Sequence, residues 1–286
     1  MKRSNVAKYI GLFFLLTAFS INPGKSENLP NGAHPDGKIL YVDTSESNKT
    51  YLATILPDGT GKTRITPVYS NIVFPKLCEA SGWIGFTNKL PDMSSEVYLL
   101  NRNGTKIKKI LNGASLEAFS PNGKFVLYTT CDKNAELYSY SIENRRSTKI
   151  SEKLKVTGAD WSSQGDWIAI SALADDGTND LWLISTMAQG IIRITKTKGV
   201  NESFPTFTKD GKNLVFITDR YGNNELEYLD LDKRSFHRPL IRGMYPALSP
   251  TNYWITYQIG EKIGISRSNG LDTKTLVEGR TPCWIK

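Results

Sequence analysis

The string GTGKT at residues 59–63 suggests chemistry, because it is similar to the end of a phosphate-binding loop. Such a loop needs a further glycine five positions before the glycine of the Gly-Lys pair, and it joins a buried strand to a helix. Position 56 is Leu56, and the flanking segments YLATIL and TRIT both read as short strands. The turn-forming residues PDGTG therefore predict a β-hairpin and argue against a nucleotide site.

Groups for nucleophilic or metal-assisted catalysis are scarce. The two histidines, His34 and His237, are expected on a turn and on an outer strand, which argues against a histidine-rich metal site. The string GISRS at 264–268 departs from the G-x-S-x-G pattern of a serine nucleophile. We therefore expect no catalytic residue.

Carboxylates and cysteines leave alternatives open. One loop, ALADDGTNDLW, contains three aspartates, and oxygen ligands for Ca²⁺ are the alternative there to a solvated turn: Asp175, Asp176 and Asp180. No other cofactor is expected. Three cysteines form no C-x-x-C motif, and export would permit one disulfide whose pair the sequence does not select: Cys78, Cys131 and Cys283.

The N-terminus predicts export. A basic segment, MKRSNVAK, precedes the apolar run YIGLFFLLTAF, and small residues allow cleavage after Ser20 or Ser26. The apolar run is shorter than the roughly 20 residues of a membrane span, so an uncleaved anchor is the alternative. We expect a signal peptide at 1–26, a flexible lead at 27–33, and a periplasmic or secreted protein without a membrane span after cleavage.

Turn-forming residues recur along the rest of the chain and indicate a repeat. They are spaced 41 to 46 residues apart, at Gly37, Gly82, Gly123, Gly165, Gly211 and Asn252. A period in the low forties with four short strands per unit is typical of a propeller blade. The sequence predicts one all-β domain over 34–286, a six-bladed β-propeller with four-stranded antiparallel blades. The approximate blades are 34–66 plus 281–286, 69–111, 114–151, 156–195, 200–240 and 242–277.

The two ends of the repeat region are complementary. The region begins at the turn HPDG without an innermost strand, and RTPCWIK at 280–286 resembles an innermost strand without a turn after it. Pro282-Cys283-Trp284 matches Pro205-Thr206-Phe207 in the fifth repeat. We therefore expect the C-terminal strand to pair into the first blade, which removes the open edge.

The fifth repeat, FPTFTKDGKNLVFITDRYGNNELEYLD, resembles the TolB-like propeller repeat, also called PD40 and related to WD40-like repeats. Weaker copies are AFSPNGKFVLYTT, ADWSSQGDWIAIS and YPALSPTNYWITY, and the resemblance covers about residues 34–286. It implies a propeller that binds envelope proteins rather than an enzyme. The expected propeller accounts for the chain without the additional N-terminal domain of TolB.

Propeller topology predicts where a partner would bind. Loops entering the innermost strands share one face with the loops between second and third strands, around the channel mouth. The first set offers Ser115, Thr157, Glu202, Ser203, Met244, Tyr245 and Arg280, and the second offers Asp132, Asp176, Arg220 and Tyr221. Such a mixture of aromatic, arginine and polar groups suits a protein or peptide partner.

Two alternatives use the central channel instead: small-molecule or glycan binding, and a carboxylate-based hydrolase or lyase activity. The formal charge of +8 is spread along the chain without interleaved aromatics, which argues against nucleic acid. We expect a monomer.

Overall fold

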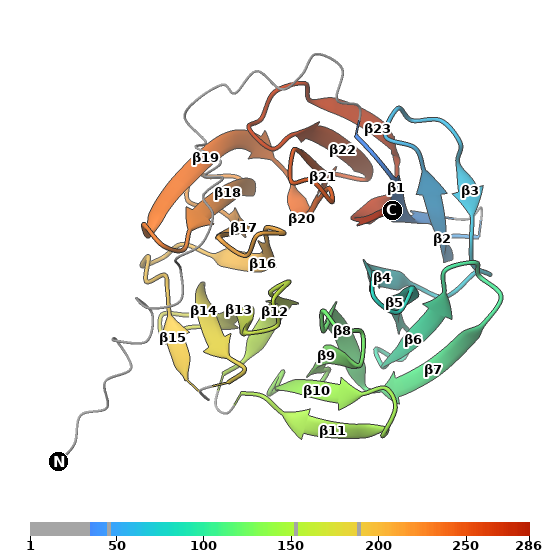
Figure 1. The fold of residues 1–286 in the computed structure, drawn as a ribbon, viewed down its shortest axis with the longest axis horizontal. Helices are drawn as coiled ribbons and strands as arrows, with labels where there is room; N and C mark the ends of the chain where they lie inside the picture. The colour runs from blue at the N-terminus through green and yellow to red at the C-terminus, as the bar shows by residue number, and fades with distance from the viewer. Residues whose placement is uncertain (1–34, 45–46, 152–153, 188–189) are drawn as a thin grey trace. The chain divides into compact units, whose positions relative to one another are not determined.

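The computed structural model describes residues 35–44, 47–151, 154–187 and 190–286. The expected signal peptide and lead lie outside these residues, as does His34. The described residues form strands and connecting loops without a helix, in six four-stranded antiparallel sheets arranged as a ring (Figure 1). The predicted six-bladed all-β propeller is therefore confirmed.

The first three blades are built from the following strands, given from the centre of the ring outward. Blade 1 contains β24 (Arg280–Ile285), β1 (Lys38–Thr44), β2 (Thr50–Ile55) and β3 (Thr63–Arg64). Blade 2 contains β4 (Ile72–Leu77), β5 (Trp83–Lys89), β6 (Ser95–Asn101) and β7 (Ile107–Asn112). Blade 3 contains β8 (Ala114–Phe119), β9 (Phe125–Thr130), β10 (Leu137–Ser141) and β11 (Arg146–Lys149).

The other three blades follow the same order. Blade 4 contains β12 (Val156–Trp161), β13 (Trp167–Leu173), β14 (Asn179–Ser185) and β15 (Ile191–Arg193). Blade 5 contains β16 (Glu202–Phe207), β17 (Asn213–Thr218), β18 (Glu225–Asp230) and β19 (Ser235–Arg242). Blade 6 contains β20 (Met244–Leu248), β21 (Trp254–Ile259), β22 (Lys262–Arg267) and β23 (Lys274–Glu278).

The hydrophobic core lies between neighbouring blades. One cluster joins Leu40 and Val42 of blade 1 to Ile84, Phe86 and Leu100 of blade 2, all of them fully or almost fully buried. Each second strand has a neighbouring blade on both faces, so its residues are apolar without strict alternation, as in the buried run of β17.

The ring closes through the C-terminal strand, as the sequence predicts. In the antiparallel pairing of β24 with β1, Trp284 lies opposite Ile39 and Cys283 lies opposite Leu40. Gly37 precedes this pairing with a φ of 94°, and a Cβ at this position would collide with the carbonyl oxygen of Ile285. Glycine is therefore required where the two ends of the propeller meet.

The GTGKT segment forms the predicted hairpin between β2 and β3. Leu56 N donates to Thr60 O, and Gly59 N donates to Leu56 O, each at 2.9 Å. The backbone amides of this turn are thus used within the turn, in contrast to the free amides of a phosphate-binding loop.

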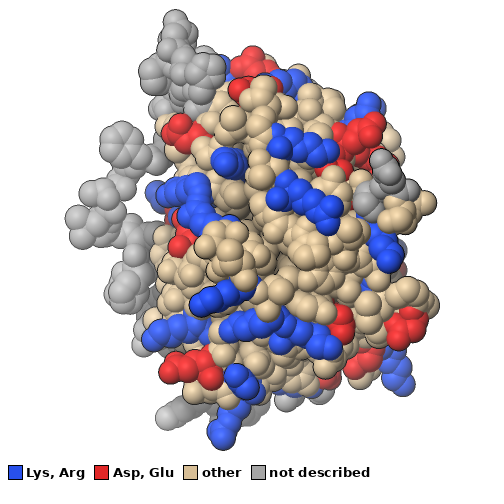
Figure 2. All heavy atoms as spheres, turned by 90° about the vertical axis from the view of Figure 1, so that its right-hand side faces the viewer, with Lys and Arg blue, Asp and Glu red and all other residues tan. Residues whose placement is uncertain are grey.

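The outer rim carries Lys and Arg side chains mixed with Asp and Glu (Figure 2). Lys109 of β7 pairs with Glu96 at 2.8 Å, and Lys62 pairs with Asp43 at 2.6 Å. The lysines on β7 also discourage edge-to-edge pairing with another sheet. The rim is therefore a solvated, mixed-charge surface.

Candidate functional site

The propeller has two faces, which strand direction defines. We call connection face the one formed by the connections between blades and the loops between second and third strands. The opposite face, here the turn face, holds the loops from first to second and from third to fourth strands. Every innermost strand runs from the connection face to the turn face, because each blade is antiparallel and repeats the same order.

The candidate residues from the sequence all lie toward the connection face of the propeller and come from several blades. One set occupies the first two positions of innermost strands: Ser115, Thr157, Glu202, Ser203, Met244, Tyr245 and Arg280. The other set lies in loops between second and third strands: Asp132, Asp176, Arg220 and Tyr221. Most of them remain apart, and three of the four candidates from blade 5, Glu202, Arg220 and Tyr221, join one polar network.

That network stabilises blade 5 internally. The Arg220 guanidinium donates to Glu202 Oε1 at 2.6 Å, and the Tyr221 hydroxyl donates to Glu227 Oε1 at 2.8 Å. Arg220 also lies 3.6 Å from Glu227 Oε2. Glu202 is fully buried, and this burial raises its pKa. Arg220 and Glu202 are consequently engaged with each other, whereas the Tyr221 side chain is 37% exposed.

The acidic loop of blade 4 serves its own backbone. Asp176 accepts from Thr178 Oγ1 at 2.7 Å and from Gly199 N at 3.3 Å, and hydrogen bonding from Thr178 lowers its pKa. Asp180 is buried and pairs with Arg193. Among the residues that the structure describes, no group of three His, Cys, Asp or Glu side chains is arranged to hold a metal ion. The loop geometry therefore gives no support to the Ca²⁺ alternative.

An aromatic cluster that the sequence analysis did not identify lies across the channel. The Phe74 ring is 5.7 Å from that of Phe204 and 5.3 Å from that of Tyr245, and the last two rings are 4.9 Å apart. Their strands, β4, β16 and β20, belong to blades 2, 5 and 6, and blades 2 and 5 are opposite one another in the ring. We call Phe74, Phe204 and Tyr245 the aromatic plug.

The plug depends on a backbone irregularity in each innermost strand. Phe74, Phe204 and Tyr245 have φ values of 52°, 51° and 52°, and each precedes a proline. The pairing register of all three strands shifts at these positions. In the sequence, the repeated Phe-Pro and Tyr-Pro dipeptides could have pointed to these positions. Proline restricts the backbone of the residue before it, and a positive φ at such a residue is unusual.

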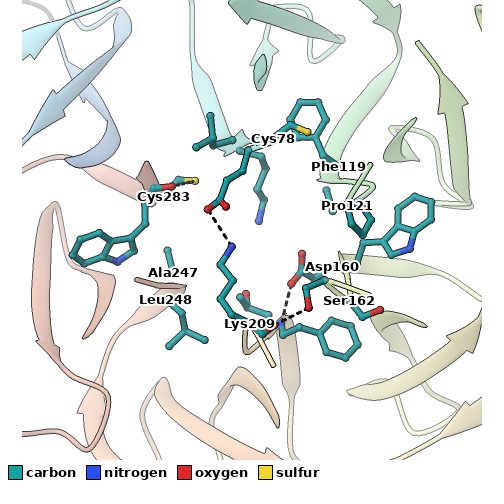
Figure 3. Close-up of a pocket in the computed structure, with 18 of the residues that line it drawn as sticks. Cys78, Phe119, Pro121, Asp160, Ser162, Lys209, Ala247, Leu248 and Cys283 are labelled. Carbon is teal, nitrogen blue, oxygen red and sulfur yellow. Dashed lines mark hydrogen bonds and ion pairs between the residues drawn. The ribbon is translucent and has the colours of Figure 1, made fainter. Parts of the chain in front are cut away.

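A cavity of about 340 Å³ occupies the channel on the other side of the plug, toward the turn face. Its lining comes from the second halves of all six innermost strands and from the turns that follow them; Asp160, Lys209 and Cys283 are labelled in the close-up (Figure 3). At the mouth, the Lys209 ammonium group lies 3.4 Å from Glu79 Oε1. The channel then narrows to a compartment of about 40 Å³ against the plug.

The cavity wall contains ionisable groups that burial has shifted. Burial raises the pKa of Glu117 to about 7, and Glu117 Oε1 accepts from Thr129 Oγ1 at 2.8 Å. Burial also raises the pKa of Asp160, which accepts from Phe207 N at 2.8 Å. The pKa of the Cys283 thiol is likewise raised by burial, so the thiol stays protonated at neutral pH. All three cysteines are free, and the disulfide that export would permit is not formed.

Six four-stranded blades, closed by the last strand, define a six-bladed β-propeller. The chain belongs to the PD40 family, described as TolB beta propeller domain, whose sequence profile matches residues 117–281. This match confirms the resemblance seen in the fifth repeat.

Similar proteins agree with this assignment. A protein TolB homolog of Chlorobium luteolum is 25% identical over 140 residues, which are 48% of this chain and 31% of that protein. Among solved structures, TolB from Acinetobacter baumannii has a TM-score of 0.77 at 19% identity, covering 87% of this chain and 66% of that one. The putative TolB from Agrobacterium tumefaciens has a TM-score of 0.52 at 17% identity, covering 86% of this chain and 83% of that one. These likenesses establish the fold, and the chain spans about a third of the curated relative.

Proposed function

We propose that this protein is an exported, non-enzymatic binding module of the cell envelope that engages a protein or peptide over its connection face. One observation carries the proposal. Exposed apolar side chains surround that face, from five different parts of the ring: Val68, Met93, Leu173, Tyr221 and Ile259. Together with the arginine and polar side chains of the same face, these apolar groups provide the mixture of contacts found in protein interfaces.

The turn face has a different distribution. In its loops, the exposed large apolar side chains among the described residues are Met187 in blade 4 and Tyr253 and Leu271 in blade 6. Three more lie at or near the starts of the outermost strands of blades 2, 4 and 5: Ile107, Ile191 and Phe236. Those three are on the outer rim, so the apolar groups in the turn-face loops come from blades 4 and 6 alone. The connection face therefore offers the broader apolar contact.

Export and location are part of the same proposal. We propose that residues 1–26 are a signal peptide, followed by a lead at 27–33 and the propeller at 34–286, and that the protein acts as a monomer in the periplasm or outside the cell. No helix in the described part of the chain is long and apolar enough to cross a membrane. The family membership and the TolB-like structures support an envelope protein as the partner class.

Two methionines allow a matched experiment. Met93 and Met187 are 91% and 86% exposed and lie on opposite faces. A photo-crosslinking amino acid at position 93 should capture a discrete envelope protein in cells, and the same group at position 187 should not. Met93→Asp should release the partner, because a carboxylate replaces an apolar contact, while Met187→Asp should retain it. Equal capture from both positions would exclude the connection face as the binding surface.

A further inference from the structure

The channel cavity lies between the aromatic plug and the turn face. Its lining includes the turns that follow the innermost strands, and the narrow compartment is lined by the three rings of the plug. Five prolines line it: Pro75, Pro246 and Pro282 from both compartments, Pro121 from the wide one and Pro205 from the narrow one. Proline fixes φ, so this wall is rigid and largely preformed, which reduces the entropy lost on binding. A volume of about 340 Å³ suits a small ligand.

Three charged groups of the channel wall are not paired with one another. Lys76 lines both compartments, Asp160 lines the wide one and Glu117 the narrow one. None of the ion pairs among the described residues includes any of the three. They are nevertheless close enough to interact. Burial raises the pKa of both carboxyls, and the Lys76 ammonium acts on both in the opposite direction.

This arrangement constrains the charge of a ligand. Charges taken out of water are usually paired. Here the half-buried Lys76, the half-buried Asp160 and the buried Glu117 face the same channel without an ion pair between them. An anion would be attracted by Lys76 and repelled by Asp160 and Glu117. A simple cation would be repelled by Lys76 and attracted by the two carboxylates. A molecule with an ammonium group at one end and a carboxylate at the other meets opposite charge at both ends.

The remaining lining fits the apolar part of such a molecule. The cavity includes the aromatic side chains of Phe119, Phe207 and Trp284, which are 6–9% exposed. At the mouth, the pair of Lys209 and Glu79 joins two side chains that are 47% and 42% exposed. A pair this exposed contributes little stability, so it does not prevent access from the turn face.

We propose that the channel cavity binds a small zwitterion of the amino acid or dipeptide class, with its carboxylate on Lys76 and its ammonium group on Asp160 and Glu117. The site lies at the other end of the channel from the proposed partner surface. Each proposal can therefore fail without the other.

The test compares three probes that share the isobutyl group, on the purified protein by titration calorimetry at about pH 8, where the Glu117 carboxyl is largely ionised. L-leucine carries both charges, isoamylamine only the ammonium group, and isocaproate only the carboxylate. Leucine should bind at least about tenfold more tightly than either analogue. Equal affinities, or no leucine binding up to about 10 mM, would overturn the proposal.

Two variants assign the ends of the ligand. Lys76→Met should reduce leucine affinity to that of isoamylamine, because the carboxylate loses its cation. The double variant Glu117→Gln, Asp160→Asn should reduce it to that of isocaproate. Lys124→Met, which changes an exposed lysine in the turn between β8 and β9, is the matched control and should bind leucine unchanged. A preference for leucine that survives Lys76→Met would contradict the assigned orientation. If a variant fails to fold, the comparison of the three probes on the unaltered protein still tests the proposal.

Discussion

At the scale of single residues, Glu117 shows how position changes chemistry. It occupies the place in β8 that corresponds to Pro75 in β4, at the register shift of the innermost strand. Its side chain is 9% exposed, and its carboxylate accepts from the Thr129 hydroxyl. Because burial raises the pKa of Glu117 from 4.5 to about 7, this one group makes stability depend on pH.

The sign of that dependence is defined. Between pH 4.5 and about 7 the unfolded chain loses the Glu117 proton while the folded protein keeps it, so the free energy of unfolding falls as pH rises. Glu117→Gln should remove this decline. The free energy of unfolding of the variant should exceed that of the unaltered protein by about 1–3 kcal/mol at about pH 8, and the two should be equal at about pH 4. Urea unfolding across this pH range measures the effect. Glu143→Gln, an exposed change in the same blade, is the control, and identical curves for both variants would refute the assignment.

At the scale of elements, blade 5 is held by buried ion pairs. Glu202 of β16 and Glu227 of β18 both contact Arg220 in the loop between β17 and β18. Arg238 of β19 pairs with Glu225 at 2.7 Å and lies 3.7 Å from the centre of the Tyr221 ring. These contacts join all four strands of the blade at the connection face, next to the exposed Tyr221.

Breaking the Arg220 pair should be costly. Arg220→Met removes the cation that pairs with the Glu202 carboxylate, whose side chain is 0% exposed. The change should therefore lower the free energy of unfolding by about 3 kcal/mol. Adding Glu202→Gln should recover part of that loss, since the buried charge is removed as well. Lys149→Met, which breaks the more exposed pair with Glu136, should cost less than about 1 kcal/mol. Similar losses for Arg220→Met and Lys149→Met in urea unfolding would rule out a dominant role for the buried pair.

At the scale of the whole molecule, closure joins the two ends of the propeller unit. β24 supplies the innermost strand of blade 1, and Trp284 packs with Ile39 and Ile263 between blades 1 and 6. Each blade depends on a neighbour at both faces, so the contact between the last and first blades stabilises the ring as a whole.

Deleting 281–286 should therefore abolish cooperative unfolding or lower the melting temperature sharply, because it exposes the edge of β1 and the core beside Trp284. Thermal melting followed by near-ultraviolet circular dichroism measures this. Removing only Lys286, which is exposed, should leave the melt unchanged. A truncated protein that melts like the complete one would show that closure by β24 is dispensable.

The sequence by itself determined the fold. Turn residues from Gly37 to Asn252 return at a blade-sized interval, and the proline-aromatic pattern of 282–284 repeats that of 205–207, so both blade number and closure could be predicted. These are local signals, which depend on turn chemistry and strand patterning within about forty residues. The resemblance of the fifth repeat could be recognised for the same reason.

Only the tertiary structure determined how side chains meet in the channel. Phe74, Phe204 and Tyr245 are far apart in sequence, and their rings meet because six innermost strands surround one axis. For the same reason Lys76, Glu117 and Asp160 all line the channel. Register shifts in these strands also break the two-residue alternation from which the orientation of a side chain is predicted. For the same reason, Arg220 and Glu202 were both candidate partner contacts in the sequence, although folding pairs them with each other.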